Sequence, residues 1–200
     1  MKPNSRSLGV LALALGPALA ATVQVQVQDG AGRVLPEAVV FLESREARLL
    51  VKAAPGEQMA QLNKQFVPRV LVVPVGSSVQ FPNHDTVRHH VYSFSAAKTF
   101  ELKLYSGKEA NPVVFDKTGI AVLGCNIHDH MAAWVVVVET PYYGRSAQAG
   151  TVVLNNVPAG VYRMRVWHPG LPVGAAATDQ PLVVGPADTS TTVRLAGVAP

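Results

Sequence analysis

The feature that most constrains the fold of this chain is a long series of short, valine-rich segments separated by turns. The clearest segment, TVQVQVQ at residues 22–28, alternates strictly between apolar and polar residues, as expected of a strand with one buried face. Similar segments follow it, namely VLVVPVGSSVQF, FELKLY, IAVLGC, AAWVVVVET, TVVLNNV and VYRMRVWH. Because the chain also contains 16 Gly and 15 Pro, long helices have little room. The sequence therefore predicts an all-β protein, with space for one short helix in the ambiguous region 43–64.

The first twenty residues have the layout of an export signal. Lys2 and Arg6 supply positive charge, residues 8–15 are apolar, and Ala18-Leu19-Ala20 forms a small-x-small cleavage pattern. The apolar stretch is too short to span a bilayer, and no later run approaches the roughly 18 apolar residues of a spanning helix. We therefore expect a signal peptide over residues 1–20, a periplasmic location for the mature protein, and no membrane span.

Charge gives little support for a nucleic-acid partner. The formal net charge of the whole chain is +4. Removal of residues 1–20 takes away Lys2 and Arg6, two positive charges, and leaves +2. No run of Lys or Arg remains, so we expect no nucleic-acid binding.

The one cysteine of the chain, Cys125, lies in a segment rich in metal-binding side chains, GCNIHDHM. A single cysteine cannot form a disulfide within the chain, and its ordinary role is that of a small buried apolar residue. Here, however, His128, His130 and Met131 follow within six positions. Upstream, FPNHDTVRHH brings three more histidines, so that five of the six histidines lie in these two segments. The clustering predicts a metal site.

The donor types favour copper over zinc. Structural zinc prefers four ligands from Cys, His and carboxylate, and a thioether is a poor partner for it. Copper that cycles between Cu(I) and Cu(II) suits a thiolate, two imidazoles and a weak axial methionine. The spacing Cys-x-x-His-x-x-Met would let one loop supply Cys125, His128 and Met131, with a fourth ligand from elsewhere in the fold.

Residues 66–140 resemble the cupredoxins, the blue copper proteins that include plastocyanin and amicyanin. FVPRVLVVPVGSSVQFPN is similar to the opening of the family's domain, and VVFDKTGIAVLGCNIHDHM is similar to its close, with the ligand spacing of amicyanin. The resemblance implies a Greek-key β-sandwich with one mononuclear type 1 copper ion. The implied ligands are His89, Cys125, His128 and Met131.

The choice of His89 rests on the same resemblance. The family's ligand lies six residues after the asparagine that ends the V-x-F-x-N strand, here Asn83, and a valine usually follows two residues later, here Val91. His90 is the alternative ligand. Under the favoured assignment it stands where many cupredoxins have an asparagine that braces the ligand loop, so this sequence departs from the pattern there.

The remaining polar candidates receive ordinary interpretations. His84 and His130 are expected to be loop histidines, although His130 lies close enough to tune the potential or to bind a second ion weakly. His168 is expected to make a structural hydrogen bond. Asp85 and Asp129 are expected to make turn hydrogen bonds, and Trp134 to belong to the core.

A second resemblance concerns the two ends of the mature chain. Residues 25–44 and 146–170 are similar to phrases of the carboxypeptidase regulatory-like, or transthyretin-like, sandwich domains. This similarity implies a cupredoxin domain over residues 47–140, inserted between residues 21–46 and 141–200 of a small transthyretin-like β-sandwich. Two domains in series and one extended sandwich are the alternatives. RHHVYSFSAAKTFELKLY, GCNIHD and VWHPG are together similar to a group of exported proteins labelled "methylamine utilisation protein".

These features predict a function in electron transfer. The cupredoxin resemblance implies a non-enzymatic carrier of single electrons between transient redox protein partners, with electrons leaving through His128. Ala132 and Ala133 are expected to form an apolar docking patch beside it. A copper chaperone or store is the alternative, although only Met59, Met131 and Met164 remain after residue 20 and no Met- or His-rich tract exists. An enzyme with a Cys125 nucleophile and a scaffold with a structural copper site are two further alternatives.

Overall fold

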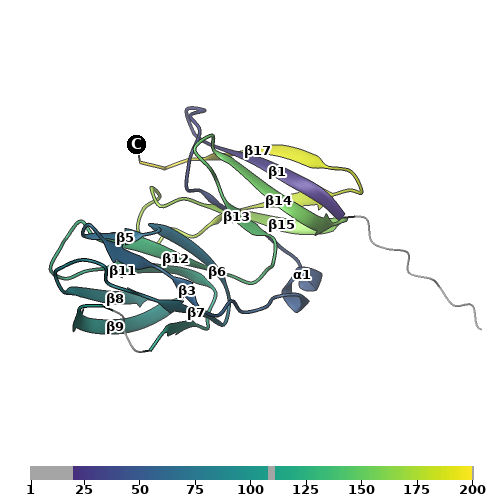
Figure 1. Ribbon diagram of the computed structural model, residues 1–200. Helices are drawn as coiled ribbons and strands as arrows, with labels where there is room; N and C mark the ends of the chain where they lie inside the picture. Colours follow the sequence, from purple (N-terminus) through teal and green to yellow (C-terminus); the bar gives the residue numbers. More distant parts are fainter. Residues whose placement is uncertain (1–19, 108–110, 200) are drawn as a thin grey trace, which may run out of the picture.

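The computed structural model describes residues 20–107 and 111–199 (Figure 1). The signal peptide predicted for residues 1–20 lies outside this part of the chain, apart from Ala20. Almost every described element is a β-strand, and the strands form β-sandwiches. The all-β prediction is therefore confirmed.

Strands from both ends of the chain form one sandwich, coloured purple and green to yellow in Figure 1. Its two sheets have the strand orders β14-β1-β17 and β13-β2-β15-β16. The seven strands are β1 (Ala20–Asp29), β2 (Val39–Glu43), β13 (Tyr143–Arg145), β14 (Thr151–Pro158), β15 (Gly160–Trp167), β16 (Thr178–Val184) and β17 (Thr189–Leu195). The alternating TVQVQVQ segment is β1, and its three valines are fully buried against the second sheet. β1 pairs antiparallel with β14 and parallel with β17, so its backbone is bonded on both edges.

The middle of the chain forms the other strands, coloured blue to teal. A five-stranded sheet has the order β6-β12-β11-β8-β9, a three-stranded sheet the order β10-β7-β3, and β4 and β5 form a hairpin. The strands are β3 (Glu57–Gln58), β4 (Ala60–Leu62), β5 (Gln65–Val67), β6 (Val70–Pro74), β7 (Ser77–Gln80), β8 (His89–Ser95), β9 (Lys98–Tyr105), β10 (Val113–Phe115), β11 (Gly119–Gly124) and β12 (Ala132–Val138). Phe81, Phe115 and Leu123 are among the side chains buried between these sheets.

The short helix expected between residues 43 and 64 is present as α1 (Arg45–Leu49), directly after β2. Ser44 caps it, because its Oγ accepts a hydrogen bond from the backbone N–H of Ala47 at 3.0 Å. None of the helical structure in residues 20–107 and 111–199 has the length and apolar character needed to cross a membrane.

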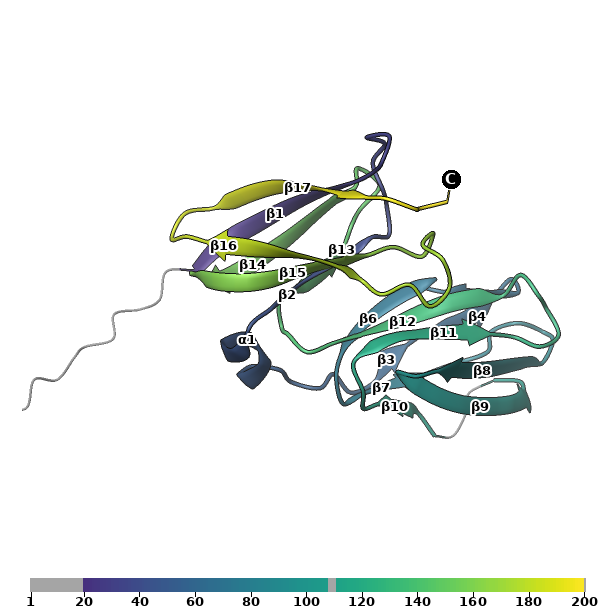
Figure 2. The same cartoon turned by 180° about the vertical axis from the view of Figure 1, so that it is seen from behind.

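The central strand β12 connects the two groups of strands because both of its faces are buried. Ala133, Val135 and Val137 face the core between the central sheets. Trp134, Val136 and Val138 instead join a separate apolar cluster with residues of β2 and β15. The five-stranded sheet and the sheet that contains β2 and β15 therefore lie against each other, as Figure 2 shows. Successive strand residues point to opposite faces, so the unbroken apolar run AAWVVVV is explained by burial on both sides.

Candidate metal centre

Three side chains with metal-binding atoms converge at one end of the five-stranded sheet. The ligand atoms of His89, Cys125 and His128 all lie within 4.8 Å of one another. Cys125 Sγ is 3.9 Å from His89 Nδ1 and 3.7 Å from His128 Nδ1. His89 is completely buried and Cys125 is 4% exposed, while His128 is partly exposed. One sulfur and two imidazole nitrogens thus face a common point, with only His128 near solvent.

Neighbouring strands place these residues. His89 is the first residue of β8, and Cys125 follows the last residue of β11, which pairs with β8 through Gly124 and Tyr92. A Cβ atom at position 124 would lie 2.8 Å from the Tyr92 ring. Glycine therefore lets the Tyr92 ring pack directly over the strand that leads to Cys125.

A tight loop returns the chain from Cys125 to β12. The backbone N–H of Met131 donates to the His128 carbonyl oxygen at 2.9 Å, and that of Ala132 donates to the His130 carbonyl oxygen at 3.1 Å. Met131 is 1% exposed and belongs to the same apolar cluster as Cys125. It also lines one surface hollow together with Cys125 and Asn126. The loop therefore brings the predicted methionine to the same end of the core as the sulfur and the two imidazoles.

The two adjacent histidines of β8 have different surroundings. His89 turns Nδ1 toward Cys125, and its Nε2 lies 2.7 Å from Asp85 Oδ2. His90 instead lies beside Glu101, with its Nε2 2.9 Å from Glu101 Oε1. That contact is too poorly aligned for a hydrogen bond, and neither ring nitrogen of His90 has a hydrogen-bond partner among the described residues. Of the two histidines, the structure thus brings only His89 to Cys125.

Asp85 connects the metal-binding trio, which consists of His89, Cys125 and His128, to the β4–β5 hairpin. Its carboxylate accepts hydrogen bonds from the backbone N–H groups of Asn63 and Lys64 at 2.6 and 2.9 Å. Burial works against ionisation of Asp85, but hydrogen bonds from Lys64, His89 and Asn63 outweigh it and lower the pKa of the carboxyl group. An ionised Asp85 accepts a hydrogen bond from the N–H at His89 Nε2. The lone pair of Nδ1 is then free to bind a metal.

The predicted turn role of Asp85 is therefore correct, but its contact with His89 was not predicted. The spacing of four residues between the two was visible in the sequence. It carries little meaning by itself, because residues 85–89 are not helical.

His128 is also held in the form that binds metal. Burial lowers the pKa of its imidazole, and positive charge on His89, Lys64 and His130 would lower it further. The neutral ring is therefore favoured at neutral pH, which leaves Nδ1 available for a metal ion.

The other three histidines, His84, His130 and His168, have the ordinary surroundings that the sequence predicted. His84 is exposed, and the exposed ring of His130 lies 6.1 Å from that of His128, measured between centroids. His168 belongs to the other sandwich, where its Nε2 donates to the Pro36 carbonyl oxygen at 3.0 Å and its Nδ1 accepts from the Gly170 N–H at 2.9 Å. His168 thus makes the expected structural hydrogen bonds.

The prediction that Ala132 and Ala133 together form a docking patch is wrong for Ala133. Ala132 is exposed, but Ala133 is fully buried in the core cluster. The reason is strand geometry: β12 begins at Ala132, so consecutive side chains point to opposite faces. Trp134 is buried as expected, although it faces the other sandwich rather than the core of its own.

Comparisons with known proteins found similarity only to solved structures. No family model matches the sequence, and no curated protein aligns with it. A copper-containing nitrite reductase from Thermus scotoductus SA-01 is 25% identical over 44% of this chain and 23% of its own, with a TM-score of 0.39. A purple cupredoxin from Nitrosopumilus maritimus is 22% identical over 41% of this chain and 99% of its own, with a TM-score of 0.37. A reduced Cu(I) form of an amicyanin mutant is 19% identical over 50% of this chain and 98% of its own, with a TM-score of 0.39. The chain thus spans about a quarter of the nitrite reductase and nearly all of the two smaller proteins.

Proposed function

We propose that this protein is a cupredoxin-like type 1 copper protein that carries single electrons between redox partners in the periplasm. The observation that carries the proposal is the convergence of His89, Cys125 and His128 within 4.8 Å. A buried thiol that faces two imidazole nitrogens, with a methionine at the end of the same loop, is the donor set that suits blue copper. His89, Cys125, His128 and Met131 would hold the copper ion, with the thioether of Met131 binding more weakly than the other three groups.

The residues around the proposed copper site suit an ion that gains and loses one electron. A bound copper ion would supply the redox chemistry at this site. The protein would hold the ligands in place before and after transfer, because Asp85 orients His89 and two backbone hydrogen bonds close the ligand loop. His128 is the most exposed of the three converging residues, so we propose that electrons enter or leave through its ring. The partners would bind there transiently, as redox proteins do in small interfaces.

The division of the chain belongs to the same proposal. We propose that residues 47–140 form the cupredoxin domain and that residues 21–46 and 141–200 form the carboxypeptidase regulatory-like sandwich. Two separate apolar clusters support this division, one formed by residues 21–42 and 152–195 and the other by residues 59–137. Ala47, at the boundary, packs with the first cluster. The similarity to the exported proteins labelled "methylamine utilisation protein" assigns no reaction.

The alternative function, copper delivery or storage, would use the same side chains with an exchangeable ion. The burial of His89 and Cys125 favours electron transfer over delivery, because a chelating partner would have little access to either side chain. A nucleophilic role for Cys125 is disfavoured for the same reason, since a substrate would have to reach a sulfur on a residue that is 4% exposed.

The test is a Cu(II) titration of the apo-protein, followed by visible absorption and electron paramagnetic resonance. We expect one equivalent of copper to produce an intense thiolate-to-copper band with narrow hyperfine splitting. The Cys125→Ser variant should lose this band, whereas His84→Gln, which changes an exposed histidine outside the trio, should keep it. Failure of the parent protein to develop the band, or equal binding of zinc, would overturn the electron-transfer proposal and favour copper handling.

A further inference from the structure

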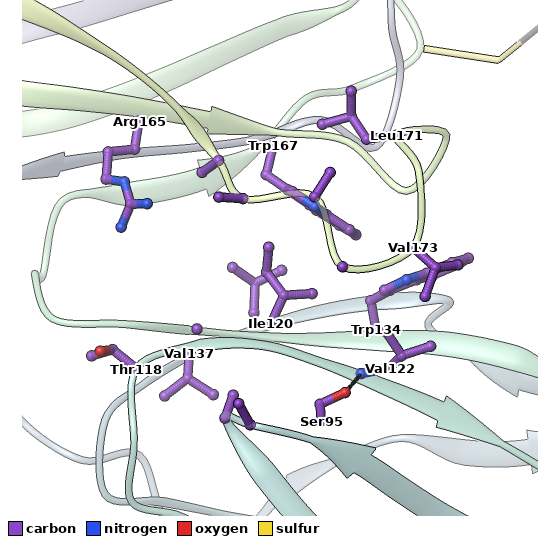
Figure 3. A pocket seen from close by; sticks show the side chains of 18 of the residues that line it. Ser95, Thr118, Ile120, Val122, Trp134, Val137, Arg165, Trp167, Leu171 and Val173 are labelled. Carbon is purple, nitrogen blue, oxygen red and sulfur yellow. Dashed lines mark hydrogen bonds between the residues drawn. The ribbon is translucent and has the colours of Figure 1, made fainter. Parts of the chain in front are cut away.

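The two sandwiches enclose an apolar cavity of about 360 Å³ that is distinct from the metal centre. Figure 3 shows Ile120 and Val122 of β11 on one side, with Trp167 and the loop that carries Leu171 and Val173 on the other. Trp134 closes one end. None of the residues that line this cavity is His89, Cys125, His128 or Met131. Cavities of this size at the junction of two domains are typical small-molecule sites.

Two indole N–H groups that line this cavity have no hydrogen-bond partner among the described residues. Trp134 is 7% exposed and Trp167 is 3% exposed, and their ring centroids lie 6.0 Å apart. The N–H group of neither ring donates to any described residue, and neither nitrogen is completely shielded from solvent. The indole N–H of a largely buried tryptophan usually has an acceptor, and a molecule bound in the cavity can supply one here. Two such donors on one cavity therefore indicate a ligand that supplies an oxygen acceptor.

The charged residue at the far end of the cavity is already neutralised. Arg165 Nε donates to Asp179 Oδ1 at 2.8 Å, and its Nη1 lies 3.5 Å from Glu43 Oε1. Arg165 therefore has no unpaired charge to attract an anion. Lys117 lies at the rim of the cavity but is exposed, where water screens its charge. An uncharged ligand fits these surroundings better than a carboxylate.

From these three observations we propose that the cavity binds a small, uncharged, ring-containing molecule with a carbonyl oxygen. The ring occupies the apolar space between β11 and the 171–177 loop, and the oxygen accepts a hydrogen bond from an indole N–H. Val122 lies three residues before Cys125 on an extended strand, so their Cα atoms are about 10 Å apart. The ligand would thus lie near the metal centre without replacing any of its ligands, and the proposal stands whether or not copper binds.

The experiment compares three probes of nearly the same size, namely acetophenone, ethylbenzene and benzoate. The chain has only two tryptophans, so a proton–nitrogen spectrum of the ¹⁵N-labelled protein has two indole signals, and both report on this cavity. We expect acetophenone to shift at least one of them downfield in a saturable way. Since a net hydrogen bond contributes about 1 kcal/mol, acetophenone should bind about fivefold more tightly than ethylbenzene. Benzoate should bind more weakly than acetophenone.

Variants test whether the probe occupies this cavity. Ala176→Phe places a ring on the exposed loop that borders the cavity and should weaken acetophenone binding at least tenfold. Ala187→Phe makes the same change at an exposed position outside the cavity and should have no effect. Trp167→Phe and Trp134→Phe each remove one donor, and the variant that loses the preference for acetophenone over ethylbenzene identifies the donor.

Three results would overturn the proposal. The first is the absence of a saturable shift of either indole signal with acetophenone. The second is equal affinity for acetophenone and ethylbenzene, or tighter binding of benzoate than of acetophenone, because the assigned ligand class would then be wrong. The third is unchanged binding in both Ala176→Phe and a second filling variant, Ile120→Phe, because the probe would then lie elsewhere. Each variant's fold is checked by its thermal unfolding transition and by the unchanged signals of the other sandwich.

Discussion

The carboxylate of Asp85 and the ring of His89 form a pair in which one side chain orients the other. Asp85 Oδ2 lies 2.7 Å from His89 Nε2, while His89 Nδ1 faces Cys125 Sγ at 3.9 Å. The same carboxylate accepts two backbone hydrogen bonds from the turn that joins β4 to β5. A turn in one part of the sandwich therefore sets which nitrogen of His89 is offered to the metal centre.

We predict that Asp85→Asn lowers copper affinity by about 10- to 100-fold, the usual cost of removing a carboxylate that orients a metal-binding histidine. The neutral amide has one acceptor oxygen where the carboxylate has two, so it cannot serve both His89 and the turn. Competition with a chelator of known affinity measures the change. Asp116→Asn is the matched control, because Asp116 is an exposed carboxylate paired with Lys98. Equal affinity of Asp85→Asn and Asp116→Asn would show that Asp85 has no part in metal binding.

We also predict opposite results for the two neighbouring histidines of β8. His89→Ala should abolish the thiolate-to-copper band, because it removes the nitrogen that faces Cys125. His90→Ala should keep the band, because the ring of His90 lies beside Glu101 and away from the sulfur. Visible absorption after addition of one equivalent of copper measures both. A band that survives in His89→Ala and disappears in a folded His90→Ala would transfer the ligand assignment to His90.

Much of the metal centre could be predicted because its residues are close together in the sequence. The loop from Cys125 to Met131 is seven residues long, so its donors can hardly lie far apart. The contribution of His89 depended on a resemblance and on counting from Asn83, since no local rule distinguishes it from His90. Asp85 was placed in a turn correctly, yet its contact with His89 depends on how that turn packs against β8, and such packing leaves no periodic signal in the sequence.

The contact between the two sandwiches could not be predicted from the sequence. Alternation reveals one buried face, as in β1, but the run AAWVVVV of β12 has no alternation. The run therefore indicates that both faces of β12 are buried, but it does not show which part of the protein covers the second face. Trp134 and Trp167 are 33 positions apart, and only the pairing of β2 with β15 brings Trp167 to the face opposite β12. The cavity between them is a property of this tertiary contact.

A third prediction concerns Ser146, which connects the two ends of the chain within one sandwich. Its Oγ accepts from the Ala38 N–H at 2.9 Å and donates to the Leu35 carbonyl oxygen at 2.6 Å, and the residue is 5% exposed. Ser146→Ala leaves both backbone groups without this partner, so we expect a loss of about 1–3 kcal/mol in the free energy of unfolding. Urea denaturation measures it. Ser190→Ala, an exposed serine on β17, should change stability by less than about 0.5 kcal/mol. Equal effects of the two substitutions would contradict the role assigned to Ser146.

The last prediction is a dependence of stability on pH that comes from His168. Burial lowers the pKa of His168 in the folded protein, although its hydrogen bond to the Pro36 carbonyl oxygen acts in the opposite direction. Protonation would place a hydrogen on Nδ1, which accepts from the Gly170 N–H, so the charged ring loses that contact.

Because the folded pKa lies below the unfolded value of about 6.5, the unfolded state binds more protons as the pH falls. Stability should therefore decrease from about pH 7.5 downward, by at most about 1.4 kcal/mol per pH unit, until the folded pKa is reached. Urea denaturation of the apo-protein at pH 7.5 and pH 5.5 measures this decrease. His168→Gln should make it smaller, whereas His84→Gln, which replaces an exposed histidine, should leave it as in the parent. His128 also has a lowered pKa, so part of the decrease should remain in His168→Gln. If His168→Gln keeps the full decrease, protonation of His168 does not destabilise the fold and the assigned cause is wrong.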